Sequence, residues 1–169
     1  MELWESTIQD LYQSAVDAFP NTGLRQHATQ PVVIKNLQWI PYLGMKTLYI
    51  KGLAQNEGRE YRPMINFRQV NYNDRKNSVK FYASDNMPYE IEKISLTEND
   101  ITVRCDCPDF RFRFAYYNFL DSSLYGRKPQ KYIRKTENFP PANPSGLPGM
   151  CKHLIKLQEV LQKAKIFKD

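Results

Sequence analysis

Residues 101–107 read ITVRCDC, an alternating run that ends in two cysteines. In a β-strand, side chains two residues apart leave the same face of the sheet. This run therefore places four side chains on one face: Ile101, Val103, Cys105 and Cys107. Because the two aliphatic residues are expected to face the core, the run predicts a pair of thiols at the buried end of a strand, which Pro108 terminates because it has no N–H to donate.

A second short cluster, Cys151-Lys152-His153, contains the remaining cysteine and one of the two histidines of the chain. Three sulfurs and one imidazole form the four-coordinate set that tetrahedral zinc prefers. Residues i and i+2 of a helix point to nearly opposite sides, so this cluster shares one metal only if Cys151 lies at or before a helix start. We therefore predict a zinc site with four ligands: Cys105, Cys107, Cys151 and His153.

The predicted charges of this site favour zinc. A helix N-terminus stabilises a thiolate and disfavours an imidazolium, so we expect deprotonated Cys151 and neutral His153. Three thiolates and one zinc leave one negative charge, which Arg104 and Lys152 are placed to offset. Four protein ligands leave no position for water, which predicts a structural rather than a catalytic metal. The alternative is three reduced structural cysteines and an ordinary helix histidine.

The order Cys-x-Cys, then Cys-x-His, resembles the SWIM-type zinc finger. That family has the first pair at a strand end and the second pair at the start of a helix. The flanking sequences CPDF (107–110) and GLPGMCKHLI (146–155) also resemble it. Here 43 residues, 108–150, separate the two pairs, which is longer than that family's spacer. The arrangement with a long insert also resembles proteins of large tailed bacteriophages.

The N-terminal 100 residues predict a helix followed by a sheet. Helical spacing relates Trp4, Ile8, Leu11, Tyr12, Ala15 and Phe19, and the helix is expected to end at residues 20–23. Between residues 31 and 103, short runs rich in Val, Ile, Tyr and Phe alternate with turn clusters. We expect an antiparallel sheet of about five strands, whose last hairpin joins residues 91–96 to 101–105.

The C-terminal part is expected to be a zinc-clamped strand, insert and helix. Residues 110–124 fit a strand by alternation and a helix by the spacing of Phe110, Phe114, Tyr117, Leu120 and Leu124, and the helix explains more residues. Residues 125–149 are rich in proline and predict an irregular segment, and residues 151–167 predict a final helix. The fold class is α+β in a single domain, 1–169, with residues 1–100 forming the helix and sheet, and residues 101–169 forming the SWIM-like zinc-binding region.

The amino-acid composition limits the classes of protein to which this chain can belong. Of 169 residues, 25% are charged and 41% hydrophobic, which is typical of a globular domain. No stretch reaches the roughly 20 apolar residues that span a bilayer, and the acidic start MELWE does not resemble a signal peptide. Three cysteines cannot all pair within the chain, so we expect an intracellular, reducing location, with a virion as a second possibility.

The basic charge is concentrated in the C-terminal part. Residues 1–100 contain 11 Lys and Arg against 12 Asp and Glu, whereas residues 101–169 contain 13 against 6. Residues 125–135 interleave cations with aromatic rings, which suits nucleic acid, a protein partner or a solvated loop. The candidate contact residues are Arg111, Arg113, Arg127, Lys128, Lys131, Tyr132, Arg134 and Lys135.

These observations favour a binding protein over an enzyme. The chain has no glycine-rich phosphate loop, no dinucleotide fingerprint and no nucleophile elbow, and the zinc prediction uses every cysteine. We predict a non-enzymatic, zinc-stabilised structural subunit of a larger assembly, which contacts other protein subunits and neither a membrane nor a small-molecule substrate. The bacteriophage resemblance implies a tailed-phage virion component of the tail, baseplate or neck. The alternative is a nucleic-acid-binding SWIM-type module.

Overall fold

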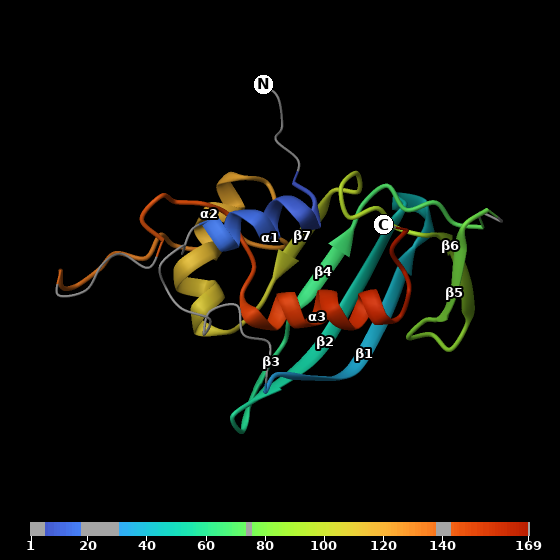
Figure 1. Cartoon of the computed structure of the whole chain (residues 1–169), viewed down its shortest axis with the longest axis horizontal. Helices are drawn as coiled ribbons and strands as arrows, with labels where there is room; N and C mark the ends of the chain where they lie inside the picture. Colours follow the sequence, from blue (N-terminus) through green and yellow to red (C-terminus); the bar gives the residue numbers. More distant parts are fainter. Residues whose placement is uncertain (1–5, 18–30, 74–75, 138–142, 169) are drawn as a thin grey trace.

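A computed structural model describes residues 6–17, 31–73, 76–137 and 143–168 (Figure 1). It has an α+β fold, as predicted, with a helix near each end of the chain and an antiparallel sheet between them. The helices are α1 (Ile8–Asp17), α2 (Ala115–Leu120) and α3 (Lys152–Lys163), with a 3-10 turn at Leu43–Met45 and a π-helical turn at Phe110–Phe114.

The main sheet has five antiparallel strands, as the sequence predicts. Its strand order is β1-β2-β4-β7, and the short strand β3 pairs with the far end of β2 beside β4. The strands are β1 (Val33–Tyr42), β2 (Thr47–Asn56), β3 (Arg59–Tyr61), β4 (Met64–Phe67) and β7 (Ile101–Arg104). Glu57 and Gly58 join β2 to β3, and both have positive φ, at 51° and 77°. A two-residue hairpin of this kind needs positive φ at both positions.

The predicted hairpin between residues 91–96 and 101–105 is wrong. Strand β6 (Pro88–Glu92) pairs with β5 (Ser78–Tyr82) in a separate two-stranded sheet, and β7 pairs with β4. The intervening loop is fastened to the end of β4, because the Asn99 side chain donates to the carbonyls of Arg68 and Gln69 at 2.8 and 3.2 Å. The turn residues in this segment therefore form an anchored loop rather than a hairpin.

Helices α1 and α3 bury the apolar stripes that their spacing predicts. Helix α3 crosses one face of the sheet (Figure 1), and Leu154, Leu157 and Leu161 are fully buried there. Helix α1 buries three residues near β7: Ile8, Leu11 and Ala15. Thr7 and Asp10 exchange hydrogen bonds at its start, which satisfies backbone N–H groups that the helix leaves free. Of the other residues predicted for this stripe, Tyr12 is 37% exposed, and Trp4 and Phe19 lie outside the described part.

The helix predicted over residues 110–124 spans residues 108–120 instead, and its buried face differs from the predicted one. Pro108 does not end the strand ladder, because pairing stops at Arg104; it lies in the first helical turn, which tolerates proline. Phe110 and Phe114 are buried, but Leu120 is 62% exposed. The π-helical turn inserts an extra residue per turn and shifts the phase of the stripe. Consequently, Ala115 and Asn118 face the core after it.

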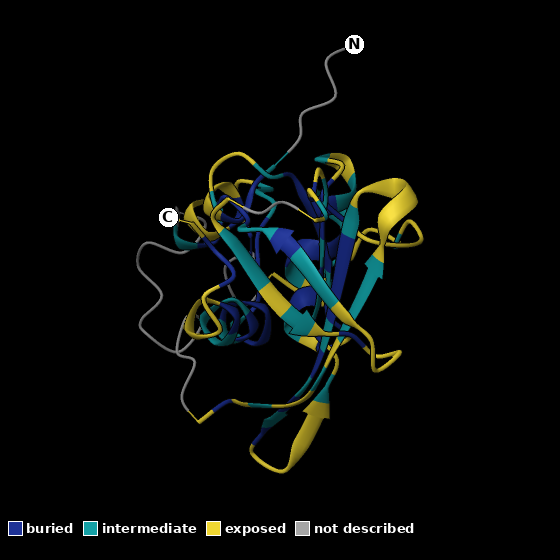
Figure 2. Ribbon diagram, turned by 90° about the vertical axis from the view of Figure 1, so that its right-hand side faces the viewer, coloured by how far each residue is buried: buried dark blue, intermediate teal, exposed yellow. Residues whose placement is uncertain are grey.

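The insert covers the outer edge of the sheet. The backbone N–H of Val103 in β7 donates to the carbonyl of Ser123, and the N–H of Tyr125 donates to the carbonyl of Val103. This short parallel pairing satisfies backbone groups that an edge strand would otherwise present to other chains. Figure 2 shows buried residues where strands and helices face one another, and exposed residues along the turns.

Candidate metal centre

The four side chains predicted as ligands lie together in the structure. Their ligand atoms are all within 4.8 Å of one another, and all four residues are buried. The Nδ1 atom of His153 lies 3.9 Å from the sulfur of Cys105 and 3.8 Å from that of Cys151. None of the three cysteines forms a disulfide. This cluster could hold a metal ion.

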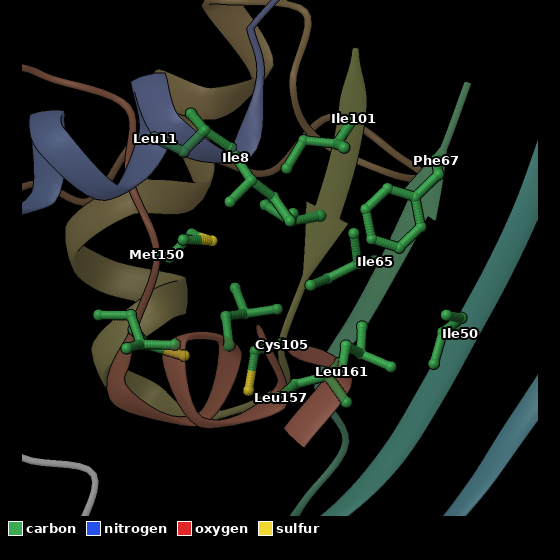
Figure 3. Close-up of a cluster of buried hydrophobic side chains, with 14 of the residues drawn as sticks. Ile8, Leu11, Ile50, Ile65, Phe67, Ile101, Cys105, Met150, Leu157 and Leu161 are labelled. Atoms are coloured by element: carbon green, nitrogen blue, oxygen red, sulfur yellow. The ribbon is translucent and has the colours of Figure 1, made fainter. Parts of the chain in front are cut away.

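Each ligand is placed by the end of a regular element. Cys105 and Cys107 follow β7 directly and are 3% and 1% exposed. Cys151 is the N-cap of α3, with extended backbone angles of φ −75° and ψ 170°, so its side chain turns toward that of His153 in the first turn. This geometry is what the i, i+2 spacing requires. In Figure 3, Cys105 lies in the same apolar cluster as Leu157 and Leu161 of α3.

The spacing of the ligand atoms suits a tetrahedral ion of the size of zinc. Zinc–sulfur bonds of about 2.3 Å and a zinc–nitrogen bond of about 2.0 Å bring sulfurs to about 3.8 Å and sulfur and nitrogen to about 3.6 Å. The two sulfur–nitrogen distances, 3.8 and 3.9 Å, are close to that geometry. The widest separation within the cluster exceeds it by at most about an ångström. Small side-chain movements therefore suffice to close the site.

Without metal, Cys107 is the thiol of the cluster that ionises most readily. Hydrogen bonds from the Cys105 and Cys151 thiols lower the pKa of Cys107 far below its usual range, and the backbone N–H of Phe110 donates to the same sulfur at 3.3 Å. Burial raises the pKa of Cys105 and the pKa of Cys151 well above their usual value. Burial thus outweighs the helix N-terminus that favours a Cys151 thiolate, and a bound cation is needed to ionise all three thiols.

Metal binding is therefore expected to release about two protons, one each from Cys105 and Cys151. Because protons compete with the metal, affinity should rise by about a hundredfold per pH unit while both thiols remain protonated in the metal-free state. Calorimetric titration of zinc in buffers of different ionisation enthalpy measures the number released. A value near zero would contradict the assignment of these thiols as ligands.

The two cations expected to offset the thiolates differ in their placement. Lys152 lies with Cys107 and His153 around one pocket beside the cluster. Arg104 instead donates from its Nη1 atom to the carbonyls of Tyr125 and Arg127 at 2.9 and 3.3 Å. The Arg104 guanidinium therefore fastens the insert to the end of β7, a role that the sequence did not reveal.

The imidazole of His153 is held by packing on one side. The ring of Tyr61 lies 4.7 Å from it, centroid to centroid. Its Nδ1 atom faces the sulfurs, whereas its Nε2 atom is buried and has no hydrogen-bond partner among the described residues. A metal-bound histidine usually donates its second N–H to a partner. The orientation therefore suits metal binding through Nδ1 and leaves one donor available.

Two buried asparagines that sequence reasoning missed fix the return of the insert to Cys151. The side chain of Asn118 accepts from the N–H of Gly149 at 2.8 Å and donates to its carbonyl at 3.0 Å. Asn143 bonds both backbone groups of Leu147 and the carbonyl of Arg113. A carboxamide can pair with both the N–H and the C=O of one residue, which explains the choice of asparagine. The only signal in the sequence was a polar residue, Asn118, in a segment predicted to be an amphipathic helix, and Asn143 had none.

Asn118→Leu is expected to destabilise the protein by about 2–5 kcal/mol, since the buried N–H and C=O of Gly149 would lose their partners. It should also weaken metal binding, because these bonds position the residue two before Cys151. Denaturant unfolding and zinc titration measure the two effects. As a control, Gln162→Leu replaces an exposed amide on α3 and should change the free energy of unfolding by less than about 0.5 kcal/mol. Equal behaviour of the two variants would exclude the proposed role of Asn118.

The candidate contact residues do not form one uniform surface. Arg113 is directed inward and lies 3.1 Å from the carboxylate of Asp109. Three cations lie over aromatic rings, namely Arg111 over Phe112, Lys128 over Phe119 and Lys131 over Tyr116. The remaining candidates, Arg127, Tyr132, Arg134 and Lys135, lie along the irregular part of the insert.

Comparisons with protein-family models, with curated proteins and with solved structures find no match. The assignment of the site therefore rests on its residues and their geometry. Among the described residues, no helix combines the length and apolar content needed to cross a bilayer.

Proposed function

We propose that the cluster holds zinc and that this protein is a non-enzymatic structural subunit of a larger assembly. The observation that carries the proposal is the convergence of four buried ligands on one point. Three sulfurs and one nitrogen satisfy tetrahedral zinc and leave no position for a substrate or water. The metal would then contribute to stability rather than to catalysis.

The position of the cluster explains what the metal would stabilise. The insert, residues 108–150, begins directly after Cys107 and ends directly before Cys151. A shared ion would thus tie the two ends of the insert together and to the front of α3. The insert contains nine aromatic residues and all of the candidate contact cations. We propose that the metal holds this segment in the shape that a partner recognises.

The identity of the assembly rests on resemblance. The ligand order resembles the SWIM-type zinc finger, and the long insert resembles proteins of large tailed bacteriophages. We therefore extend the proposal to a virion component in the tail, baseplate or neck. Three unpaired buried cysteines also support a reducing intracellular environment during synthesis and folding.

The second candidate function is binding to nucleic acid. It is favoured by the charge of the insert, because Arg111, Arg127, Lys128, Lys131 and Lys135 have no carboxylate within 4.0 Å among the described residues. Such cations can contact phosphates without regard to sequence. The partner in that case would be a nucleic acid inside the cell or virion.

Native mass measurement of the complex purified from its source, with metal retained, tests the first proposal. The expected result is a complex larger than the 19.9 kDa chain, with one zinc in each copy of this chain. A monomer without partners would contradict a structural subunit. Titration with single-stranded and duplex oligonucleotides tests the alternative, because phosphate contacts predict affinity that falls steeply with salt.

A further inference from the structure

A groove runs along the insert beside the metal cluster. It has a volume of about 750 Å³, and Cys105 and Phe110 contribute to its lining. One side is formed by the π-helical turn, and the other is formed by the proline-containing segment 129–135. The groove therefore lies between two parts of the insert, the π-helical turn and residues 129–135. Because Cys105 contributes to its lining, it is next to the metal cluster.

The lining of the groove combines exposed apolar side chains with unpaired cations. Phe112, Tyr132 and Ile133 are 47%, 53% and 79% exposed, which is unusual for residues so close together. Arg111, Lys131 and Lys135 line the same groove. Among the described residues, no carboxylate lies within 4.0 Å of these three cations. The acidic residue in the described lining, Asp106, is paired with Arg62 at 3.4 Å.

The rings in the groove are poorly placed for stacking against bases. Phe112 and Tyr132 contact each other with centroids 5.0 Å apart and planes tilted by 54°. Arg111 also lies over the Phe112 ring, and Lys131 lies over the neighbouring Tyr116 ring. Single-strand binding instead uses open ring faces on which successive bases stack. The exposed side chain of Ile133 is aliphatic, so it has no ring on which a base could stack.

We propose that this groove binds an acidic segment of a neighbouring protein that also carries an aromatic or aliphatic anchor residue. The anchor would cover Phe112, Tyr132 and Ile133, and flanking carboxylates would pair with Arg111, Lys131 and Lys135. Buried aromatic anchors with charged pairs around them are the usual arrangement of a protein–peptide contact. This inference rests on the proposed function as an assembly subunit, and it specifies the chemistry of the partner.

Selection of short random peptides on the zinc-loaded protein tests this groove. We expect enriched sequences to combine Asp or Glu with an aromatic or aliphatic residue. Affinity for a selected peptide should fall at least about tenfold in the double variant Lys131→Glu/Lys135→Glu. The matched control Lys35→Glu/Lys163→Glu makes the same change in charge at exposed sites elsewhere and should retain affinity. Circular dichroism and zinc content establish that both variants fold.

Two results would overturn the proposal. One is the absence of acidic enrichment, or peptide binding that is equal in the two double variants. The other is tight, salt-sensitive binding of oligodeoxythymidine that the Lys131→Glu/Lys135→Glu variant loses, which would assign the groove to nucleic acid. Neither result depends on the native mass measurement. A negative result for peptide binding in the groove can therefore be distinguished from a negative result for the assembly proposal.

A different observation carries a second inference, about the pocket on the other side of His153. This pocket has a volume of about 400 Å³, and Asn56 and His153 both line it. Within the part of the chain that the structure describes, the Oδ1 atom of Asn56 and the Nε2 atom of His153 are buried and without hydrogen-bond partners. Asn56 is 8% exposed and His153 is 2% exposed. The two residues thus line the same cavity, and a buried polar atom without a partner is costly.

We infer that Asn56 is a positioning residue for the metal ligand His153 and acts through one bridging water. A small shift of the two side chains toward the pocket would let the water accept from Nε2–H and donate to Oδ1, which satisfies both buried atoms. Holding the proton on Nε2 leaves Nδ1 free to bind the ion beside the sulfurs. The hairpin turn at Glu57 and Gly58 follows Asn56 directly and fixes its position at the end of β2.

Zinc affinity measured by competition with a chelator tests this role. Asn56→Leu should weaken zinc binding by about 10–100-fold, whereas Asn56→Asp, which retains an acceptor, should restore it. Glu57→Gln changes an exposed group at the edge of the same pocket and should have no effect. The Nε2–H proton of His153 should give a slowly exchanging NMR signal in the zinc-loaded protein and in Asn56→Asp, but not in Asn56→Leu. Wild-type affinity and an unchanged signal in Asn56→Leu would overturn the inference.

Discussion

Removal of zinc by a strong chelator is expected to abolish the cooperative thermal transition of this protein or to lower its midpoint by about 20–40 °C. A structural zinc contributes about 10–16 kcal/mol in zinc-finger peptides at neutral pH, which matches the roughly 5–15 kcal/mol stability of a whole domain. The loss should be large here because the candidate ligands join the end of β7 to the start of α3, and both belong to one apolar core. Calorimetry with and without chelator measures the effect.

The reverse experiment serves as the control for chelation. Zinc added back in slight excess should restore the original midpoint, whereas magnesium should not, since thiolates bind it poorly. An unchanged melt after chelation, together with no zinc by elemental analysis, would exclude a structural metal. The cysteines would then be reduced core residues, which is the alternative left open by the sequence.

Replacing one sulfur ligand is expected to have the second largest effect. Cys105→Ser or Cys151→Ser should remove stoichiometric zinc and destabilise the protein by most of the metal's contribution. Each hydroxyl would lie at a site that is at most 3% exposed, and a serine is a poor zinc ligand compared with a thiolate. Zinc content after gel filtration and urea unfolding of the same preparation measure both consequences.

Met150→Leu is the matched control for these variants. Met150 precedes Cys151 and is 1% exposed, so this change also replaces a buried sulfur-containing side chain beside the cluster. A swap that conserves volume should cost less than about 1.5 kcal/mol and should leave zinc bound. If Cys105→Ser and Met150→Leu behaved alike and both retained zinc, the sulfur of Cys105 could not be a ligand.

The sequence predicted the elements whose pattern is local. Apolar spacing located α1 and α3, and the alternation of residues 101–107 located β7. The Cys-x-Cys pair and the Cys-x-His pair were also predicted to meet at one site, because each spacing allows its two side chains to share a metal only at the end of a strand or helix. Local geometry therefore determined most of the candidate site before the fold was known.

Prediction from the sequence failed where contacts between residues far apart in the chain determine the structure. The strand pairing of β7 depends on Asn99, whose side chain bonds the end of β4, and residue spacing carries no sign of that contact. The changed buried face after Phe114 follows from a π-helical turn, which has no clear sequence pattern. Asn118 and Asn143 pair with backbone groups roughly 30 residues away or within a loop, so only the folded chain reveals their role.

Burial also changes the chemistry expected from sequence. Position at a helix N-terminus predicted a ready thiolate at Cys151, but the surrounding core raises the pKa of this thiol. Three thiolates are stable in the same core only when a cation lies among them, because burial of an unpaired charge is costly. We therefore expect the apolar cluster around Cys105 in Figure 3 to make the site dependent on a bound cation.

X-ray absorption spectroscopy at the zinc edge, on protein purified without added metal, tests the central claim most directly. The predicted result is one zinc per chain, bound by three sulfurs at about 2.3 Å and one nitrogen at about 2.0 Å, with no oxygen ligand. A protein that contains no zinc, or a zinc bound mainly by oxygen, would contradict the account.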